Sequence, residues 1–141
     1  MSAAETDDLT SDDVQVSPLS RGLKSGGLRR VAAIDIGTNS THLLVASVDP
    51  VLGTFSIIQA EKSTTRLGER DPETGELSAA AMERGFETLR RFLDLANSHQ
   101  VEQVVTAATS AVREAPNGRD FLQSIKDELG IEVDLVSGPE E

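Results

Sequence analysis

The sequence Val-Ala-Ala-Ile-Asp-Ile-Gly-Thr-Asn-Ser occupies residues 31–40. Its apolar first half is typical of a buried β-strand, and Gly37 lets the backbone turn without a Cβ clash. The polar residues that follow offer successive N–H groups, which can hold an anion without a formal positive charge. Asp35, near the end of the strand, is placed to orient a metal-bound water. An ordinary hairpin turn, in which Gly, Asn and Ser are common, explains these residues equally well.

The segments that follow this turn predict a mixed α/β fold. Two further short strands come first, then a long polar loop, and then helices alternating with strands. The polar loop, residues 62–77, is long for a connection in a compact domain, and such loops are often functional. The predicted strands are residues 31–36, 42–48, 55–60, 101–108 and 131–136; the predicted helices are a twenty-residue helix capped by Ser78, one turn at 109–114, and a helix from Phe121 stopped by Gly130.

The resulting order is β-β-β-α-β-α-β. The first three strands are close enough in sequence to form an antiparallel meander, and the later ones imply right-handed parallel crossovers. This order resembles a ribonuclease-H-like half-domain, as found in the actin-like ATPase superfamily, where two such halves face each other across a cleft. A likeness of this kind concerns the fold and does not establish a function.

Composition limits the classes of protein to which the chain can belong. Its 141 residues suit one domain, and the net charge of −11 argues against a nucleic-acid binder, DNA included. An anion-binding protein with this charge must gather its few cations at one place, use backbone N–H groups or recruit a metal. The sequence has no cysteine, no signal peptide and no apolar run long enough to cross a membrane, so a cytoplasmic location is expected.

The chain divides into two parts by composition. Residues 1–28 are acidic, rich in Ser and Gly and poor in large apolar residues, so they are predicted to be a disordered tail. Residues 29–141 form the predicted half-domain, truncated at its C-terminal end.

Several stretches in register resemble the exopolyphosphatase / guanosine-pentaphosphate phosphatase family, Ppx/GppA. No single motif is decisive, but their shared order and spacing over residues 31–141 are specific. They are Ala33-Ile-Asp-Ile-Gly-Thr-Asn-Ser40 with His42-Leu-Leu-Val-Ala46, Lys62 through Arg66-Leu-Gly-Glu69, Thr106-Ala-Ala-Thr-Ser-Ala-Val-Arg113, Asn117 with Asp120-Phe121, and Leu135-Val-Ser-Gly-Pro-Glu-Glu141.

The resemblance implies hydrolysis of the terminal phosphoanhydride of inorganic polyphosphate, or of the 5′ γ-phosphate of guanosine pentaphosphate, assisted by Mg²⁺. The substrates would be the partners of the protein, with a homodimer possible at full length. In this reading Glu141 is the catalytic carboxylate, preceded by Glu140, and Asp35 faces the metal. The phosphate-binding residues would be Gly37, Thr38, Asn39, Ser40, Arg66 and Arg113.

Each of these assignments has an ordinary alternative. Arg113 stands next to Glu114 and could form a surface ion pair. Glu140 and Glu141, taken alone, would be solvated acids. At the level of the whole chain, the alternatives are a phosphate-binding or nucleotide-binding fragment without turnover, and another phosphotransferase of the actin-like fold, such as a sugar or acetate kinase.

The sequence departs from the family's pattern in three places. Thr41 stands where the family usually has a bulky apolar residue, which predicts looser packing behind the turn. Pro139 is uncommon before the Glu pair and could shift its register. The family's second phosphate loop, an Asp-x-Gly-Gly-Gly-Ser-like stretch, does not occur in these residues, so the chain alone is expected to be inactive.

Overall fold

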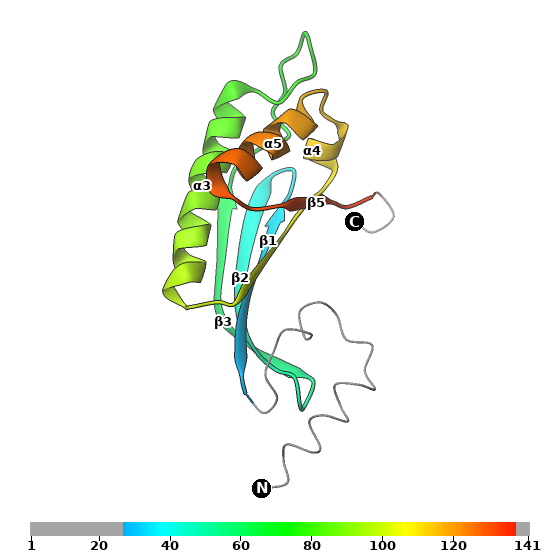
Figure 1. The fold of residues 1–141 in the computed structure, drawn as a ribbon. Coiled ribbons are helices and arrows are strands. Elements are labelled where there is room, and N and C mark those ends of the chain that lie inside the picture. Colours follow the sequence, from blue (N-terminus) through cyan, green and yellow to red (C-terminus); the bar gives the residue numbers. More distant parts are fainter. Residues whose placement is uncertain (1–26, 138–141) are drawn as a thin grey trace, which may run out of the picture.

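A five-stranded mixed sheet with three helices makes up residues 27–137, the part of the chain that the computed structural model describes (Figure 1). The predicted tail, residues 1–28, lies almost wholly outside the described residues. The elements are β1 (Arg29–Ile36), β2 (Ser40–Asp49), β3 (Thr54–Thr64), α3 (Ala79–Ser98), β4 (Gln103–Ala108), α4 (Ser110–Glu114), α5 (Gly118–Leu129) and β5 (Val133–Leu135).

The strand order confirms the predicted fold class. The strands lie in the order β3-β2-β1-β4-β5. β1 pairs antiparallel with β2, and β2 antiparallel with β3, which is the expected meander. β4 pairs parallel with both β1 and β5, as the strand–helix–strand connections require. This arrangement brings the C-terminal ends of β1 and β4 to the same edge, beside the start of β2.

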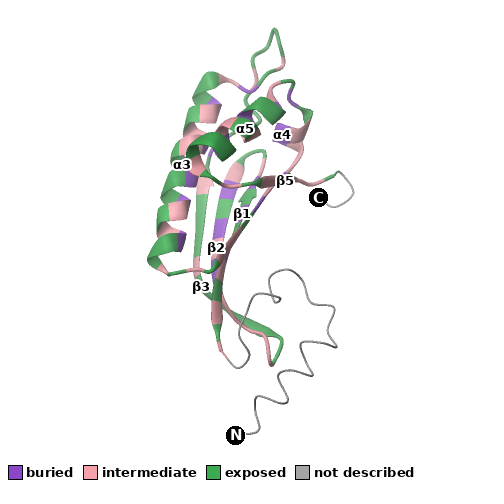
Figure 2. Ribbon diagram, viewed as in Figure 1, coloured by how far each residue is buried: buried purple, intermediate pink, exposed green. Residues whose placement is uncertain are grey.

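The hydrophobic core lies between one face of the sheet and the helices α3 and α5. Alternate residues of β1 and β2 point into it, as expected for strands with one covered face. Figure 2 shows buried positions along the side of α3 that faces the sheet. Phe121 of α5 packs edge-on against Phe86 of α3, with ring centroids 5.6 Å apart. Within the described residues, the opposite face of the sheet leaves Phe55, Ile57 and Val105 exposed.

The helix ends follow local chemistry. Ser78 caps α3 by accepting a hydrogen bond from the N–H of Ala81 at 3.1 Å. Gly130 ends α5 in the left-handed conformation, with φ of 74°. Between α4 and α5 the backbone comes so close that a Cβ at Gly118 would lie 1.9 Å from the carbonyl oxygen of Val112. Only glycine fits that junction without a shift of the backbone.

Several predicted boundaries are wrong. Four strands start two residues away from the predicted position, namely β1 at Arg29, β2 at Ser40, β4 at Gln103 and β5 at Val133. Two larger differences have a clear cause. The sequence places the start of the polar loop at Lys62, whereas β3 continues to Thr64 in register with the first residues of β2. β3 is an edge strand with mostly exposed residues, so hydrophobicity does not mark where it ends. The last helix begins at Gly118 rather than at Phe121. Its first turn is polar, so the apolar spacing used for the prediction does not mark where the helix starts. No helix of residues 27–137 is long and apolar enough to cross a membrane.

Candidate functional site

The turn between β1 and β2 is held closed by its own backbone. The N–H of Gly37 donates to the carbonyl oxygen of Ser40 at 3.0 Å. A Cβ at position 37 would lie 2.9 Å from that same oxygen, so glycine is needed for this close approach. Because the Gly37 N–H is used inside the turn, the N–H groups of Thr38 and Asn39 are the ones left to hold an anion. Neither donates a hydrogen bond to another residue of the described part of the chain.

The loop after β3 is bonded directly to this turn. The N–H of Arg66 donates to the carbonyl oxygen of Asn39 at 3.0 Å, and the N–H of Gly68 donates to that of Thr38 at 2.9 Å. Arg66 has φ of 49°, in the left-handed region, which is uncommon for a residue with a Cβ. Its side chain is exposed. The structure therefore brings the backbone of Arg66 beside the turn.

Two buried threonines join the same segments from behind. Thr41, at the start of β2, is 1% exposed, and Thr65, next to Arg66, is fully buried. Their hydroxyl groups are hydrogen-bonded at 2.9 Å. Thr65 therefore satisfies the polar group that Thr41 introduces, so this departure from the family's pattern leaves no unpaired hydroxyl group behind the turn.

The start of α4 flanks the turn on its other side. The N–H of Thr109 donates to the carbonyl oxygen of Ile36 at 3.1 Å. The hydroxyl groups of Thr38 and Ser110 lie 3.3 Å apart. Three segments that are distant in sequence thus meet at one edge of the sheet. They are the turn between β1 and β2, the loop after β3 that carries Arg66 (the Arg66 loop), and the residues that begin α4.

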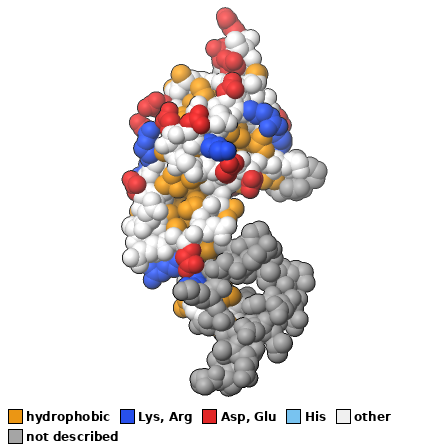
Figure 3. Space-filling model, in the orientation of Figure 1, with side chains coloured by type: hydrophobic (Ala, Val, Ile, Leu, Met, Phe, Trp, Pro, Cys, Tyr) orange, Lys and Arg blue, Asp and Glu red, His pale blue; other side chains and the backbone are white. Residues whose placement is uncertain are grey.

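Arg113 lies on α4 and reaches toward the end of β5. Its Nη1 donates to the carbonyl oxygen of Val136, and its Nη2 lies 3.5 Å from Oε2 of Glu114. The surface ion pair considered as an alternative is therefore present, although a long and partly exposed pair contributes little stability. Figure 3 shows basic side chains gathered beside α4, whereas acidic ones crowd the loop projecting at the top of the view. Basic side chains also lie at other places on this face, so the cations are not gathered at one place.

Asp35 offers a single exposed carboxylate near the end of β1, on the sheet face that the helices leave open. Residues 27–137 contain no group of three or more His, Cys, Asp or Glu side chains able to hold a metal ion. Mg²⁺ usually keeps several waters and is bound through one or two carboxylates together with substrate phosphates. Asp35 fits that mode of binding and does not form a dedicated metal cage.

The predicted catalytic pair, Glu140 and Glu141, lies outside the described residues, as does Pro139. Val136, which accepts the hydrogen bond from Arg113, stands four residues before Glu140.

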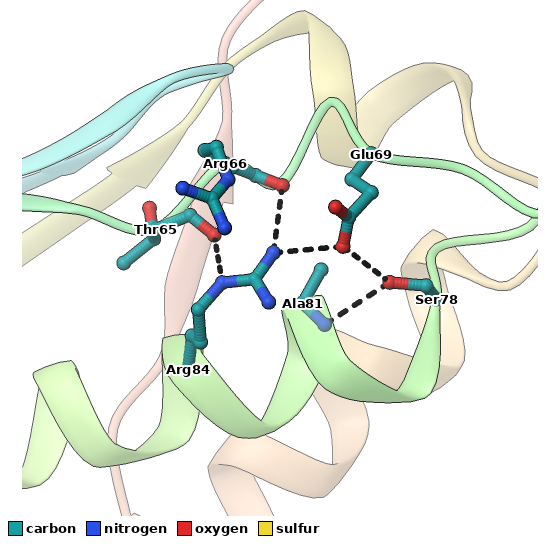
Figure 4. A network of polar contacts seen from close by, with 6 residues as sticks. All are labelled: Thr65, Arg66, Glu69, Ser78, Ala81 and Arg84. Atoms are coloured by element: carbon teal, nitrogen blue, oxygen red, sulfur yellow. Dashed lines mark hydrogen bonds and ion pairs between the residues drawn. The ribbon is translucent and has the colours of Figure 1, made fainter.

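Sequence reasoning missed a network behind the Arg66 loop (Figure 4). Arg84 of α3 donates through Nη2 to Oε1 of Glu69 at 2.9 Å, and Oγ of Ser78 donates to the same oxygen at 3.2 Å. These hydrogen bonds, that from Arg84 first, lower the pKa of Glu69. Ser78 is recognisable in the sequence as a helix cap, but nothing local in the sequence links it to Glu69 or to Arg84.

Comparison with known proteins identifies the family to which the chain is similar. The profile of the Ppx/GppA phosphatase family matches residues 44–141. The family member from Aquifex aeolicus has a solved structure that is 34% identical, with a TM-score of 0.75 over 81% of this chain and 37% of that one. An exopolyphosphatase from Cytophaga hutchinsonii is also 34% identical, with a TM-score of 0.73 over 80% of this chain and 36% of that one.

The fold and the turn define a ribonuclease-H-like half-domain with a glycine-bearing loop after its first strand. The chain belongs to the Ppx/GppA phosphatase family. It spans little more than a third of the length of the solved relatives it matches.

Proposed function

We propose that this chain supplies the first half of the phosphate site of an enzyme that hydrolyses terminal phosphoanhydrides. The substrate would be inorganic polyphosphate or the 5′ γ-phosphate of guanosine pentaphosphate. The observation that supports this most strongly is the meeting of the turn, the Arg66 loop and the start of α4 at one sheet edge. Family membership supports the same reaction class, and one solved relative is described as an exopolyphosphatase.

In this proposal the turn holds the terminal phosphate. The N–H groups of Thr38 and Asn39 donate to its non-bridging oxygens, while Gly37 shapes the turn. The hydroxyl groups of Thr38 and Ser40 add donors at the same place. Arg66 and Arg113 neutralise the charge on the phosphate oxygens, because the guanidinium fork matches phosphate geometry. Phosphoryl transfer depends mainly on such positioning and charge stabilisation.

The chemical step is attack by water on the terminal phosphorus. A new P–O bond forms, the bridging P–O bond breaks, and the shortened phosphate chain leaves. Glu141 takes the proton from the water, with Glu140 beside it, and general-base help of this kind is worth about 10²–10⁴-fold. Mg²⁺, brought by the substrate and held partly by Asp35, would supply charge neutralisation on the phosphate oxygens.

The activity of the isolated chain is a separate question, because the chain spans little more than a third of the length of its solved relatives. We infer that residues 1–141 alone bind phosphate weakly and release little or none from polyphosphate. We propose that a protein of family length that contains this chain is cytoplasmic and forms a homodimer.

Phosphate release from polyphosphate in the presence of Mg²⁺ tests the proposal. A protein of family length that contains this chain is expected to turn over, and the 141-residue chain is not. In the longer protein, Glu141→Ala should lower turnover about 10²–10⁴-fold with an unchanged circular dichroism spectrum. The matched control is Glu128→Ala, which removes an exposed carboxylate of α5 and should leave turnover unchanged. Near-normal activity of Glu141→Ala would show that another group takes the proton.

A further inference from the structure

Arg84 connects the long helix to the loop that carries Arg66. Its Nε donates to the carbonyl oxygen of Thr65 at 2.9 Å, and its Nη2 lies 3.4 Å from the carbonyl oxygen of Arg66 (Figure 4). These two carbonyl groups belong to the peptides on either side of the Arg66 Cα. One guanidinium therefore holds both peptides that set the backbone conformation of Arg66.

Glu69 and Ser78 hold that guanidinium in turn. Glu69 Oε1 accepts from Arg84 at 2.9 Å and from the Ser78 hydroxyl at 3.2 Å. The Ser78 hydroxyl also caps α3, so the position of the carboxylate is tied to the first turn of the helix. The N–H of Glu69 donates to the carbonyl oxygen of Arg66 at 3.1 Å, which closes the network.

The conformation that this network fixes is an unfavourable one. A residue with a Cβ at φ of 49° is strained, and such strain persists only where the surroundings enforce it. If Arg66 relaxed to a negative φ, the hydrogen bonds from Arg66 and Gly68 to the turn would be disturbed, because both depend on the course of this loop. The direction of the Arg66 side chain would change as well.

We propose that Arg84, braced by Glu69, is a positioning residue that fixes Arg66 for contact with the bound phosphate chain. This inference rests on the proposed function. Arg84 acts through Arg66, because its Nε and Nη2 donate to the two carbonyl groups that flank the Arg66 Cα and to the carboxylate of Glu69. A matched control is available on the same helix: Arg90 forms an exposed ion pair with Glu128 at 3.5 Å and is not part of this network.

A double-mutant cycle on the 141-residue chain tests the proposal, with affinity for inorganic polyphosphate measured by calorimetry in the presence of Mg²⁺. Arg66→Ala and Arg84→Ala are each expected to weaken binding about tenfold, the size of one lost charge-assisted hydrogen bond. The double variant should bind no more weakly than Arg66→Ala alone, and Arg90→Ala should bind like the unaltered chain. Arg84→Lys keeps the charge but not the fork, and should behave like Arg84→Ala. Additive losses, or full rescue by lysine, would overturn the proposal.

Amide hydrogen exchange separates failure of this inference from failure of the proposed function. In Arg84→Ala, the amides of Arg66 and Gly68 should exchange about tenfold faster, while Arg90→Ala changes neither. If the unaltered chain binds no polyphosphate, the proposed function is overturned as it applies to this chain, and hydrogen exchange alone then tests the positioning role of Arg84. Unchanged exchange at Arg66 and Gly68 in Arg84→Ala would overturn the positioning role, whatever the binding result.

Discussion

Replacing the paired threonines behind the turn should give a strongly non-additive change in stability. Thr41→Val keeps the shape of the side chain but leaves the Thr65 hydroxyl fully buried without its partner. A buried polar group left unsatisfied costs about 1–3 kcal/mol, and Thr65→Val should cost a similar amount for the same reason. The double variant removes both hydroxyl groups, so no polar group is left unpaired. Its free energy of unfolding should lie within about 1 kcal/mol of the unaltered chain.

Urea denaturation followed by circular dichroism measures these differences, provided that the m-value stays constant among the variants. Thr106 supplies the control, because its buried hydroxyl has no hydrogen-bond partner in the structure. Thr106→Val should therefore be neutral or stabilising, in contrast to the same substitution at Thr41. The reasoning is refuted if Thr41→Val is neutral alone, or if the double variant loses the sum of the two single losses.

Two further predictions concern the α4–α5 junction and the Glu69 network. Gly118→Ala should destabilise the fold by about 1–3 kcal/mol or more, since its Cβ would overlap the Val112 carbonyl oxygen; a melting temperature equal to that of the unaltered chain would contradict this. Because the pKa of Glu69 is lowered in the folded chain, chiefly by Arg84, its stabilising contribution is present above pH 4.5 and is lost as pH falls through the folded pKa. The stability difference between the unaltered chain and Glu69→Gln should therefore shrink on acidification, as urea titrations over a pH series would show; a difference independent of pH would refute it.

The fold was largely predictable because its elements are marked by local signals. Short apolar runs indicate β1 and β2, three- and four-residue spacing indicates α3, and Gly130 marks the end of α5. Boundaries were missed where no local signal exists. The end of β3 is polar because the strand lies at the edge of the sheet, and only its pairing with β2 defines it.

The segments of the candidate site could be named from the sequence, whereas the contacts between them could not. The turn, the Arg66 loop and the Arg113 segment were each identified from the sequence, partly through the family resemblance. Their contacts depend on how strands distant in sequence end at the same edge, which composition and periodicity do not reveal. The partnership of Thr41 with Thr65 shows this well: Thr41 alone suggests a packing defect, whereas the pair is a satisfied hydrogen bond.

A residue-resolved NMR titration of the 141-residue chain with tripolyphosphate and Mg²⁺ would test whether the turn is a phosphate site. The largest amide shifts are expected at Thr38 and Asn39, with smaller ones at Arg66. No shift at the turn, or shifts confined to the basic residues Arg119 and Lys126 of α5, would contradict the assignment of the turn as half of a phosphate site.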